Sequence, residues 1–308
     1  MKPTQKPLPE EPWKWLMSWV PSMPTGNAMT SKPPSISKTL RQVSSHEGWP
    51  KARELIEFTG HSVLEANDKA LLNTLYQIAH DSGQMVVKDA EWTVRLADLR
   101  PSKHESSDRL RKSLDRLLSV VVTVPYLQPG IGEPRYLKTH LFDFFDASEN
   151  EGTAAATLRF GLPKELQPVL AQSGKWGRIR AEIVMSMTSK YAIAVYELVQ
   201  ARREMDRMVE TFPLDRFREL VGVPPGKLVR GCDFKKYVIE PAQLEVNGLS
   251  DMGVTIEVVR KSPKSPQSPI VAVSMAWWKK EGDEYRAAIQ ERARPKVGRM
   301  ARLKGTLQ

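Results

Sequence analysis

The hydrophobic and polar positions from residue 64 onward follow helical and strand periods in a regular order. Apolar residues in the first segment recur at helical spacing, which predicts a helix ending at the polar break 81–83. These residues are Leu64, Leu71, Leu75, Ile78 and Ala79. Trp92, Val94 and Leu96 then alternate with polar residues, as the side chains of a short strand do.

A second helix and a hairpin follow in the first half of the chain. Ser106, Ser107 and Asp108 can each cap this helix at its start. Its buried stripe is expected to consist of Leu110, Leu114, Leu117 and Leu118. The segment 120–124 predicts a strand, and a turn at 129–132 leads to a second strand over 136–145. This order is that of a winged helix, which a strand near 158–162 and a helix from Pro163 would complete.

The second half of the chain repeats the same order of elements. The first helix of this unit is indicated by residues that recur on one helical face, namely Tyr191, Ala194, Val195, Leu198, Val199 and Arg202. A strand at 212–214, a helix at 215–221 and a loop at 222–231 come next. Asp233 is expected to cap a further helix whose inner face carries Phe234, Tyr237, Val238, Pro241 and Leu244. The alternating segments 254–259 and 270–277 then predict a hairpin.

We therefore expect an α+β fold of two tandem winged-helix domains with a disordered N-terminal arm and a basic C-terminal tail. The expected boundaries are 1–60 for the arm, 61–182 and 183–280 for the domains, and 281–308 for the tail. The arm is inferred from its prolines, nine of the 23 in the chain lying within the first 50 residues. Its aromatic patch at 13–20 is expected to dock on the protein itself rather than on a partner.

The charge of the chain favours a polyanionic partner. A formal net charge of +10 and a pI near 9.6 are typical of nucleic-acid binding, since neutralised phosphates release condensed counterions. No stretch approaches the ~20 apolar residues of a membrane helix. The single cysteine, Cys232, and the lack of a secretory leader at residue 1 predict a cytoplasmic location.

The residues that we expect to bind DNA in the second unit lie around its last helix and in its hairpin loop. Those near the helix are Lys227, Arg230, Lys235 and Lys236, where long donors can reach base edges and phosphates. Those in the proline-rich loop are Arg260, Lys261 and Lys264, which suit a wing lying along the backbone. The alternative interpretations are a solvated helix face and an ordinary surface loop.

The first unit offers a weaker set of phosphate contacts. Its cations are Lys103, Arg109, Arg111, Lys112 and Arg116, and a solvated helix face explains them nearly as well. The hairpin from Val120 can equally pair with another subunit. The positive run from Arg292 to Lys304 is expected to add affinity that does not depend on DNA sequence.

The sequence lacks the residue patterns of metal sites and of ATP-binding loops. The five histidines are scattered without a paired metal motif, and one cysteine cannot build a zinc site. The Gly-Lys pairs are followed by Trp176 and Leu228, so neither belongs to an ATP-binding P-loop. We expect no catalysis, no cofactor and no metal.

Three segments resemble the iteron-binding initiators of theta-replicating plasmids, a family with two winged helices. Thr188 to Ile193, followed by Tyr196-Glu197-Leu198, is similar to the signature that opens the family's second domain. Asp233 to Lys236, leading to Pro241-Ala242 and Glu245-Val246-Asn247, resembles its recognition helix. Arg109 to Leu114, running into 117–122, is similar to the basic helix and strand of the first domain.

The resemblance implies a plasmid replication initiator that binds direct repeats at the origin and promotes origin opening. It also implies autoregulation with copy control, dimers that convert to DNA-binding monomers, and contacts with a host initiator ATPase and replicative helicase. Glu240 departs from a purely basic face and leaves the base contacts open. The competing interpretations are a dimeric repressor that binds an inverted repeat and a nonspecific nucleoid or partition protein.

Overall fold

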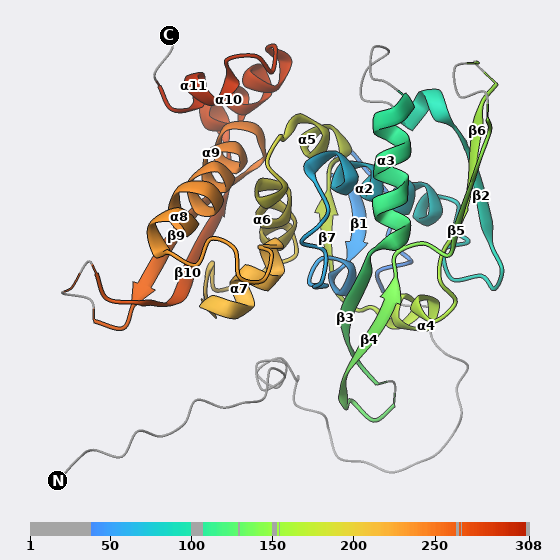
Figure 1. Ribbon diagram of the computed structural model, residues 1–308, viewed down its shortest axis with the longest axis horizontal. Helices are drawn as coiled ribbons and strands as arrows, with labels where there is room; N and C mark the ends of the chain where they lie inside the picture. The colour runs from blue at the N-terminus through green and yellow to red at the C-terminus, as the bar shows by residue number, and fades with distance from the viewer. Residues whose placement is uncertain are drawn as a thin grey trace.

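The computed structural model describes residues 38–99, 107–128, 130–149, 153, 155–262, 265 and 267–305. Figure 1 shows two units side by side, with α6 between them. The elements of the first unit are β1 (Trp49–Ala52), η1 (Arg53–Leu55), α2 (Ala66–Asp81), β2 (Glu91–Arg95), η2 (Leu96–Leu99), α3 (Ser107–Ser119), β3 (Val121–Leu127), β4 (Pro134–His140), β5 (Phe144–Ala147), β6 (Thr157–Gly161), α4 (Leu166–Gln172), β7 (Trp176–Ile179) and α5 (Ala181–Ser186).

The single strand that we expected over 136–145 is wrong, because the chain changes sheets inside it. β4 pairs with β3 as a two-stranded hairpin, whereas β5 joins β6 and β2 in a separate sheet. The consecutive residues Leu141 and Phe142 are both buried between these strands. A strand with one exposed face cannot bury two neighbours in succession, since successive side chains point to opposite faces.

Residues 49–58 belong to the folded unit, although their position places them inside the expected arm. β1 pairs antiparallel with β7, and Trp49 is 1% exposed. Pro50 is tolerated here because the sheet has only two strands, so a missing N–H costs little at an edge. The pairing joins segments far apart in sequence, which a local count of prolines does not detect. The aromatic patch at 13–20 lies outside the described residues.

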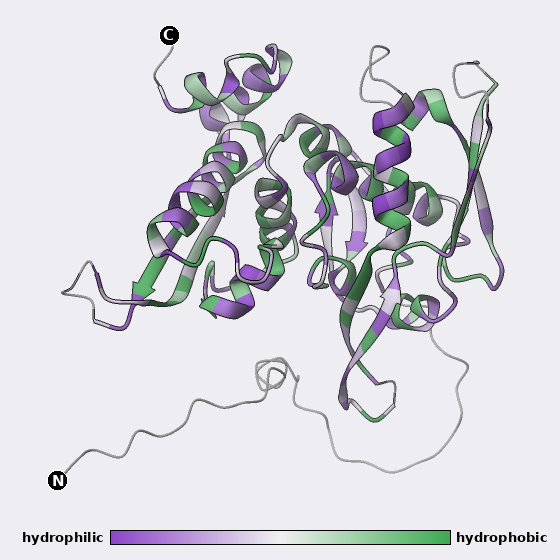
Figure 2. Ribbon diagram, viewed as in Figure 1, coloured by the Kyte–Doolittle hydropathy of each residue, from purple (hydrophilic) through white to green (hydrophobic). Residues whose placement is uncertain are grey.

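The second unit contains the expected winged-helix order. Its elements are α6 (Lys190–Gln200), β8 (Val209–Pro213), α7 (Leu214–Val221), α8 (Gly231–Phe234), η3 (Lys235–Ile239), α9 (Glu240–Leu249), β9 (Met252–Arg260), β10 (Ile270–Lys279), α10 (Gly282–Ala293) and α11 (Arg299–Leu303). The three strands form one antiparallel sheet in the order β8-β10-β9. Figure 2 shows hydrophobic and hydrophilic residues alternating along α9 and α3, as amphipathic helices require.

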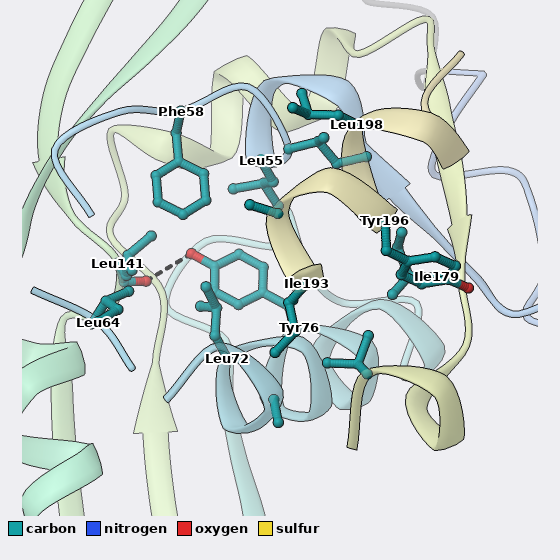
Figure 3. Packing of buried hydrophobic residues seen from close by; sticks show 14 of the residues in the cluster. Leu55, Phe58, Leu64, Leu72, Tyr76, Leu141, Ile179, Ile193, Tyr196 and Leu198 are labelled. Atoms are coloured by element: carbon teal, nitrogen blue, oxygen red, sulfur yellow. Dashed lines mark hydrogen bonds between the residues drawn. The ribbon is translucent and has the colours of Figure 1, made fainter. Parts of the chain in front are cut away.

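Helix α6 contributes side chains to the cores of both units. Every residue from Ala192 to Gln200 is buried. The helix packs against α2 and β7 on one side and against α7 and α9 on the other. Figure 3 shows Ile193 and Tyr196 of α6 among residues of the first unit, including Tyr76, whose hydroxyl donates to the Leu141 carbonyl over 2.7 Å. The two winged helices therefore share one continuous hydrophobic core.

Buried ion pairs also connect the units. The Lys51 ammonium, 2% exposed, lies 2.8 Å from Glu197 Oε1 on α6. Glu57 accepts hydrogen bonds from Arg53 and from Arg202, which follows α6. Arg216 of α7 reaches back to the Glu57 carbonyl over 3.4 Å. These contacts hold the start of the first domain against the second.

The basic C-terminal run forms two helices that pack on the protein. α10 and α11 both lie against α9. Arg292 donates to the Leu249 carbonyl at the end of α9, and Lys296 donates to the Met185 carbonyl of α5. Arg302 binds both carboxylate oxygens of Glu291. Several cations of the run thus stabilise helix ends and one buried acid, which favourable charge–dipole interactions explain.

Candidate nucleic-acid interface

Residues 231–249 form one continuous helix with a wide turn in its middle. α8 leads into the π-helical turn η3 and then into α9. Pro241 explains the wide turn, since proline has no N–H and its ring clashes with the carbonyl four residues earlier. The Glu240 N–H bonds to the Lys235 carbonyl, five residues back. The helix continues through the proline because its hydrogen bonding shifts by one residue.

The wide turn determines which side chains face outward. Phe234 and Val238 are buried as expected, but Tyr237 is 50% exposed. The inner-face prediction for Tyr237 is therefore wrong, because the π turn advances the helix by less than the usual angle per residue. Lys235, Lys236 and Glu240 are exposed beside it. We call Lys235, Lys236, Tyr237 and Glu240 the outer face of this helix.

The start of the helix also differs from the expectation. Arg230 occupies the N-cap position, so Asp233 is not the cap and lies in the first turn. There its carboxylate is 3.8 Å from the Arg230 guanidinium. An acid in the first turn interacts favourably with the helix dipole, which partly offsets the unfavourable position of nearby cations.

The loop before the helix presents two exposed cations on a fixed backbone. Lys227 and Arg230 are exposed. Arg218 of α7 donates to the Leu228 carbonyl over 3.0 Å and also to the Lys227 carbonyl. The guanidinium of Arg218 thus holds the loop that carries these cations against α7.

The hairpin of β9 and β10 carries the remaining candidates of the second unit. Arg260 donates to the Ser268 carbonyl over 2.6 Å, so its guanidinium helps to close the hairpin loop. Lys261 is exposed, and its N–H bonds to the Pro269 carbonyl over 2.9 Å. Lys264 lies outside the described residues.

The candidates of the first unit lie on α3, which Figure 1 shows separated from α8 and α9 by α2 and α6. Arg109, Arg111 and Lys112 are exposed, whereas Lys103 lies outside the described residues. Arg116 forms two hydrogen bonds with Asp68, a fully buried carboxylate of α2, over 2.6 and 2.7 Å. Its guanidinium therefore joins α3 to α2.

The leucine stripe of α3 is narrower than expected. Leu110, Leu114 and Leu117 are buried, but Leu118 is 36% exposed and does not belong to the stripe. Leu118 follows Leu117 directly, and one residue turns an α-helix by about 100°. It therefore points to the edge of the apolar face.

Two of the motifs singled out in the sequence are connected through Glu245. Its buried carboxylate accepts hydrogen bonds from the N–H groups of Thr188 and Ser189 and from the Thr188 hydroxyl. Glu245, in the middle of α9, therefore supplies acceptors for donors at the start of α6. Asn247 bonds to both the N–H and the carbonyl of Val254 on β9. These residues position the helix of the outer face.

Replacing Glu245 by alanine is expected to lower the free energy of unfolding by about 2–3 kcal/mol, since buried donors at the start of α6 lose their acceptor. Urea unfolding followed by circular dichroism measures the loss. Glu182→Ala is the matched control, because its side chain is 61% exposed and 3.9 Å from Arg180, and it should cost under about 1 kcal/mol. Equal stability of the two variants would contradict the capping role.

The described residues contain no group of three or more His, Cys, Asp or Glu side chains able to hold a metal ion. Among the same residues, no helix has both the length and the apolar character needed to cross a membrane.

Two winged helices and an exposed basic helix start define the class of tandem winged-helix DNA-binding proteins. Residues 51–200 match the sequence model described as "Initiator Replication protein, WH1", and residues 213–274 match that described as "Initiator Rep protein, WH2". The chain belongs to the initiator Rep protein family of plasmid replication. No curated protein matches it significantly. The expected fold class and the family resemblance are both confirmed.

The first match includes α6, which we expected to open the second domain. The structure explains the ambiguity, because α6 packs against both units. Plasmid replication initiation with DNA binding follows from the family.

Proposed function

We propose that the protein initiates plasmid replication by binding direct repeats, or iterons, in double-stranded origin DNA. The helix 231–249 is the main reader of the repeat, and its outer face enters the major groove. Lys227 and Arg230 before the helix, with Arg260, Lys261 and Lys264 at the wing, contact the flanking backbone. Lys103, Arg109, Arg111 and Lys112 of the first domain add phosphate contacts. Arg116 adds a further one through the exposed part of a guanidinium that also binds Asp68.

One observation carries this proposal most directly. Lys227 and Arg230 are exposed just before the helix start, where positive side chains oppose the dipole, and Lys235 and Lys236 are exposed one turn later. A bound phosphate relieves that conflict, because a helix N-terminus and these cations attract the same anion. The arrangement suits DNA better than it suits an isolated surface helix.

The remaining roles extend the family assignment. We propose that the protein opens the origin, recruits a host initiator ATPase and the replicative helicase, and represses its own gene as part of copy control. It acts in the bacterial cytoplasm as a DNA-binding monomer in equilibrium with a dimer. It needs no cofactor and catalyses no reaction.

Selection of bound sequences from a random duplex pool tests the proposal, at about 150 mM salt where nonspecific binding is weak. One asymmetric motif supports a reader of direct repeats. A palindrome would favour a dimeric repressor instead, and the absence of any enriched motif would favour a nonspecific nucleoid or partition protein.

Lys235→Ala and Lys236→Ala are each expected to weaken binding to the selected duplex by about 1–3 kcal/mol where the lysine contacts a base, and by less where it contacts phosphate. Fluorescence anisotropy at fixed salt measures the change. Lys279→Ala is the control, an exposed lysine at the far end of β10 from the hairpin loop. Unchanged affinity in both helix variants would rule out this helix as the reader.

A further inference from the structure

The outer face of the helix contains one acid among its cations. Glu240 is exposed, four residues after Lys236 on a face that otherwise carries lysines and Tyr237. Within the described residues, Glu240 has no ion pair or hydrogen bond through its carboxylate. Lys236 does not neutralise it, because the Lys236 ammonium lies over the Tyr237 ring, 5.1 Å from the ring centre. The carboxylate is thus free to accept hydrogen bonds.

The Glu240 carboxylate does not stabilise the fold. Glu240 begins α9, but the helix is continuous from Gly231, so the backbone N–H of Glu240 is already bonded to the Lys235 carbonyl. The dipole of the helix favours acids only within its first turn, which is that of Asp233. Glu245, five residues later, is the buried acid that stabilises the fold.

A carboxylate on this face has opposite effects on two kinds of DNA. Near phosphates it is repelled, which weakens binding to any sequence. In the major groove, however, the exocyclic amino groups of cytosine and adenine are donors, and a carboxylate accepts from cytosine N4. An acid in the reading face therefore lowers affinity in general and restores it only at a matching base.

We propose that Glu240 determines sequence specificity by accepting a hydrogen bond from the exocyclic amino group of one base, cytosine N4 or adenine N6. The inference rests on the proposed function, since it requires the outer face to enter the major groove. Lys236, one turn earlier, contacts the adjacent guanine or phosphate. Glu240 thereby rejects sequences that present a carbonyl acceptor, guanine O6 or thymine O4, at the same position.

The test compares Glu240→Ala and Glu240→Gln with the native protein on two duplexes. One duplex carries the sequence selected from the random pool, and the other carries the same bases in scrambled order. At fixed salt, Glu240→Ala should bind the selected duplex about 5- to 150-fold more weakly, the range for one lost base contact of about 1–3 kcal/mol. The same variant should bind the scrambled duplex more tightly, because repulsion of phosphates is removed.

Repeating the selection with Glu240→Gln adds a base-level measurement. The amide both donates and accepts and pairs well with adenine, so preference should change at one position and remain elsewhere. Glu204→Gln is the charge control, since its side chain is 89% exposed and lies outside the helix of the outer face. This control should leave the selected motif unchanged.

The outcomes separate this inference from the function on which it rests. Equal gains on both duplexes would show that Glu240 only repels phosphates, and no change on either would show that its carboxylate does not act on DNA. Either result would overturn the inference. The lysine variants, measured alongside, report on the outer face itself. One result would be weaker binding by the lysine variants while the Glu240 variants change affinity equally for the selected and the scrambled duplex. That result would support the helix as the reader of DNA and would contradict only the role proposed for Glu240.

Discussion

Replacing Glu57 by glutamine is expected to remove about 3–5 kcal/mol from the free energy of unfolding, the range for breaking a buried ion pair. Glu57 is 4% exposed and accepts hydrogen bonds from Arg53 over 2.8 Å and from Arg202 over 2.7 Å. Arg202 is itself 1% exposed. Without the Glu57 carboxylate, the positive charge of Arg202 stays buried and only Glu210 balances it.

Urea unfolding at neutral pH measures this loss. Asp98→Asn is the control, because Asp98 and Arg95 form an ion pair whose side chains are 50% and 66% exposed. Such a surface pair contributes under about 1 kcal/mol. If Glu57→Gln were as mild as this control, the ion pairs of Glu57 would not contribute to stability.

The Glu57→Gln variant should also change how the free energy of unfolding depends on pH below 4.5. Burial alone would raise the pKa of Glu57, but the guanidinium groups of Arg202, Arg53 and Arg216 hold the pKa at about 2, below the ordinary 4.5. A carboxyl with a lowered pKa stabilises the fold above pH 4.5, and this contribution is lost as the pH falls toward 2. The Glu57→Gln variant should lack that part of the acid dependence.

Arg299→Ala is expected to cost about 2–4 kcal/mol, because several buried carbonyls would lose a charged donor. Arg299 is 3% exposed. It donates to the Ser186 carbonyl of α5 over 2.8 Å and to the Arg294 carbonyl over 3.0 Å. The guanidinium therefore attaches the C-terminal helices to the first domain.

Thermal unfolding and DNA binding together test this role. Arg294→Ala is the matched control, with a side chain 62% exposed and 3.6 Å from Glu291, and it should lose under about 1 kcal/mol. The folded Arg299→Ala protein should retain its affinity for DNA. Weaker binding without a loss of stability would instead support the sequence-independent DNA contact inferred from the charge of the run.

The order of helices and strands was predictable because each winged helix follows a local period. The leucines of α2 and α3 and the alternation in β9 and β10 identify these elements within a few residues. Pairing across the chain leaves no such signal. β1 becomes a strand only because β7 lies beside it, and Pro50 together with the prolines before it suggested the opposite.

The site was predictable to the level of its basic residues but not of their contacts. The charge pattern treats Arg116 and Arg299 like Lys236, yet the first two bind Asp68 and buried carbonyls. Tyr237 faces outward because of a wide turn at Pro241, for which a fixed helical period makes no allowance. The proline itself was the signal that could have indicated this shift.

Helix α6 has a consequence for the modularity of the protein. A cut on either side of α6 would leave one winged helix with an open apolar face, because residues Ala192 to Gln200 are buried by both units. Neither half is thus a portable module that could be exchanged between initiators at this boundary. The winged-helix fold occurs twice along the chain, but the two copies share one hydrophobic core and are expected to unfold together.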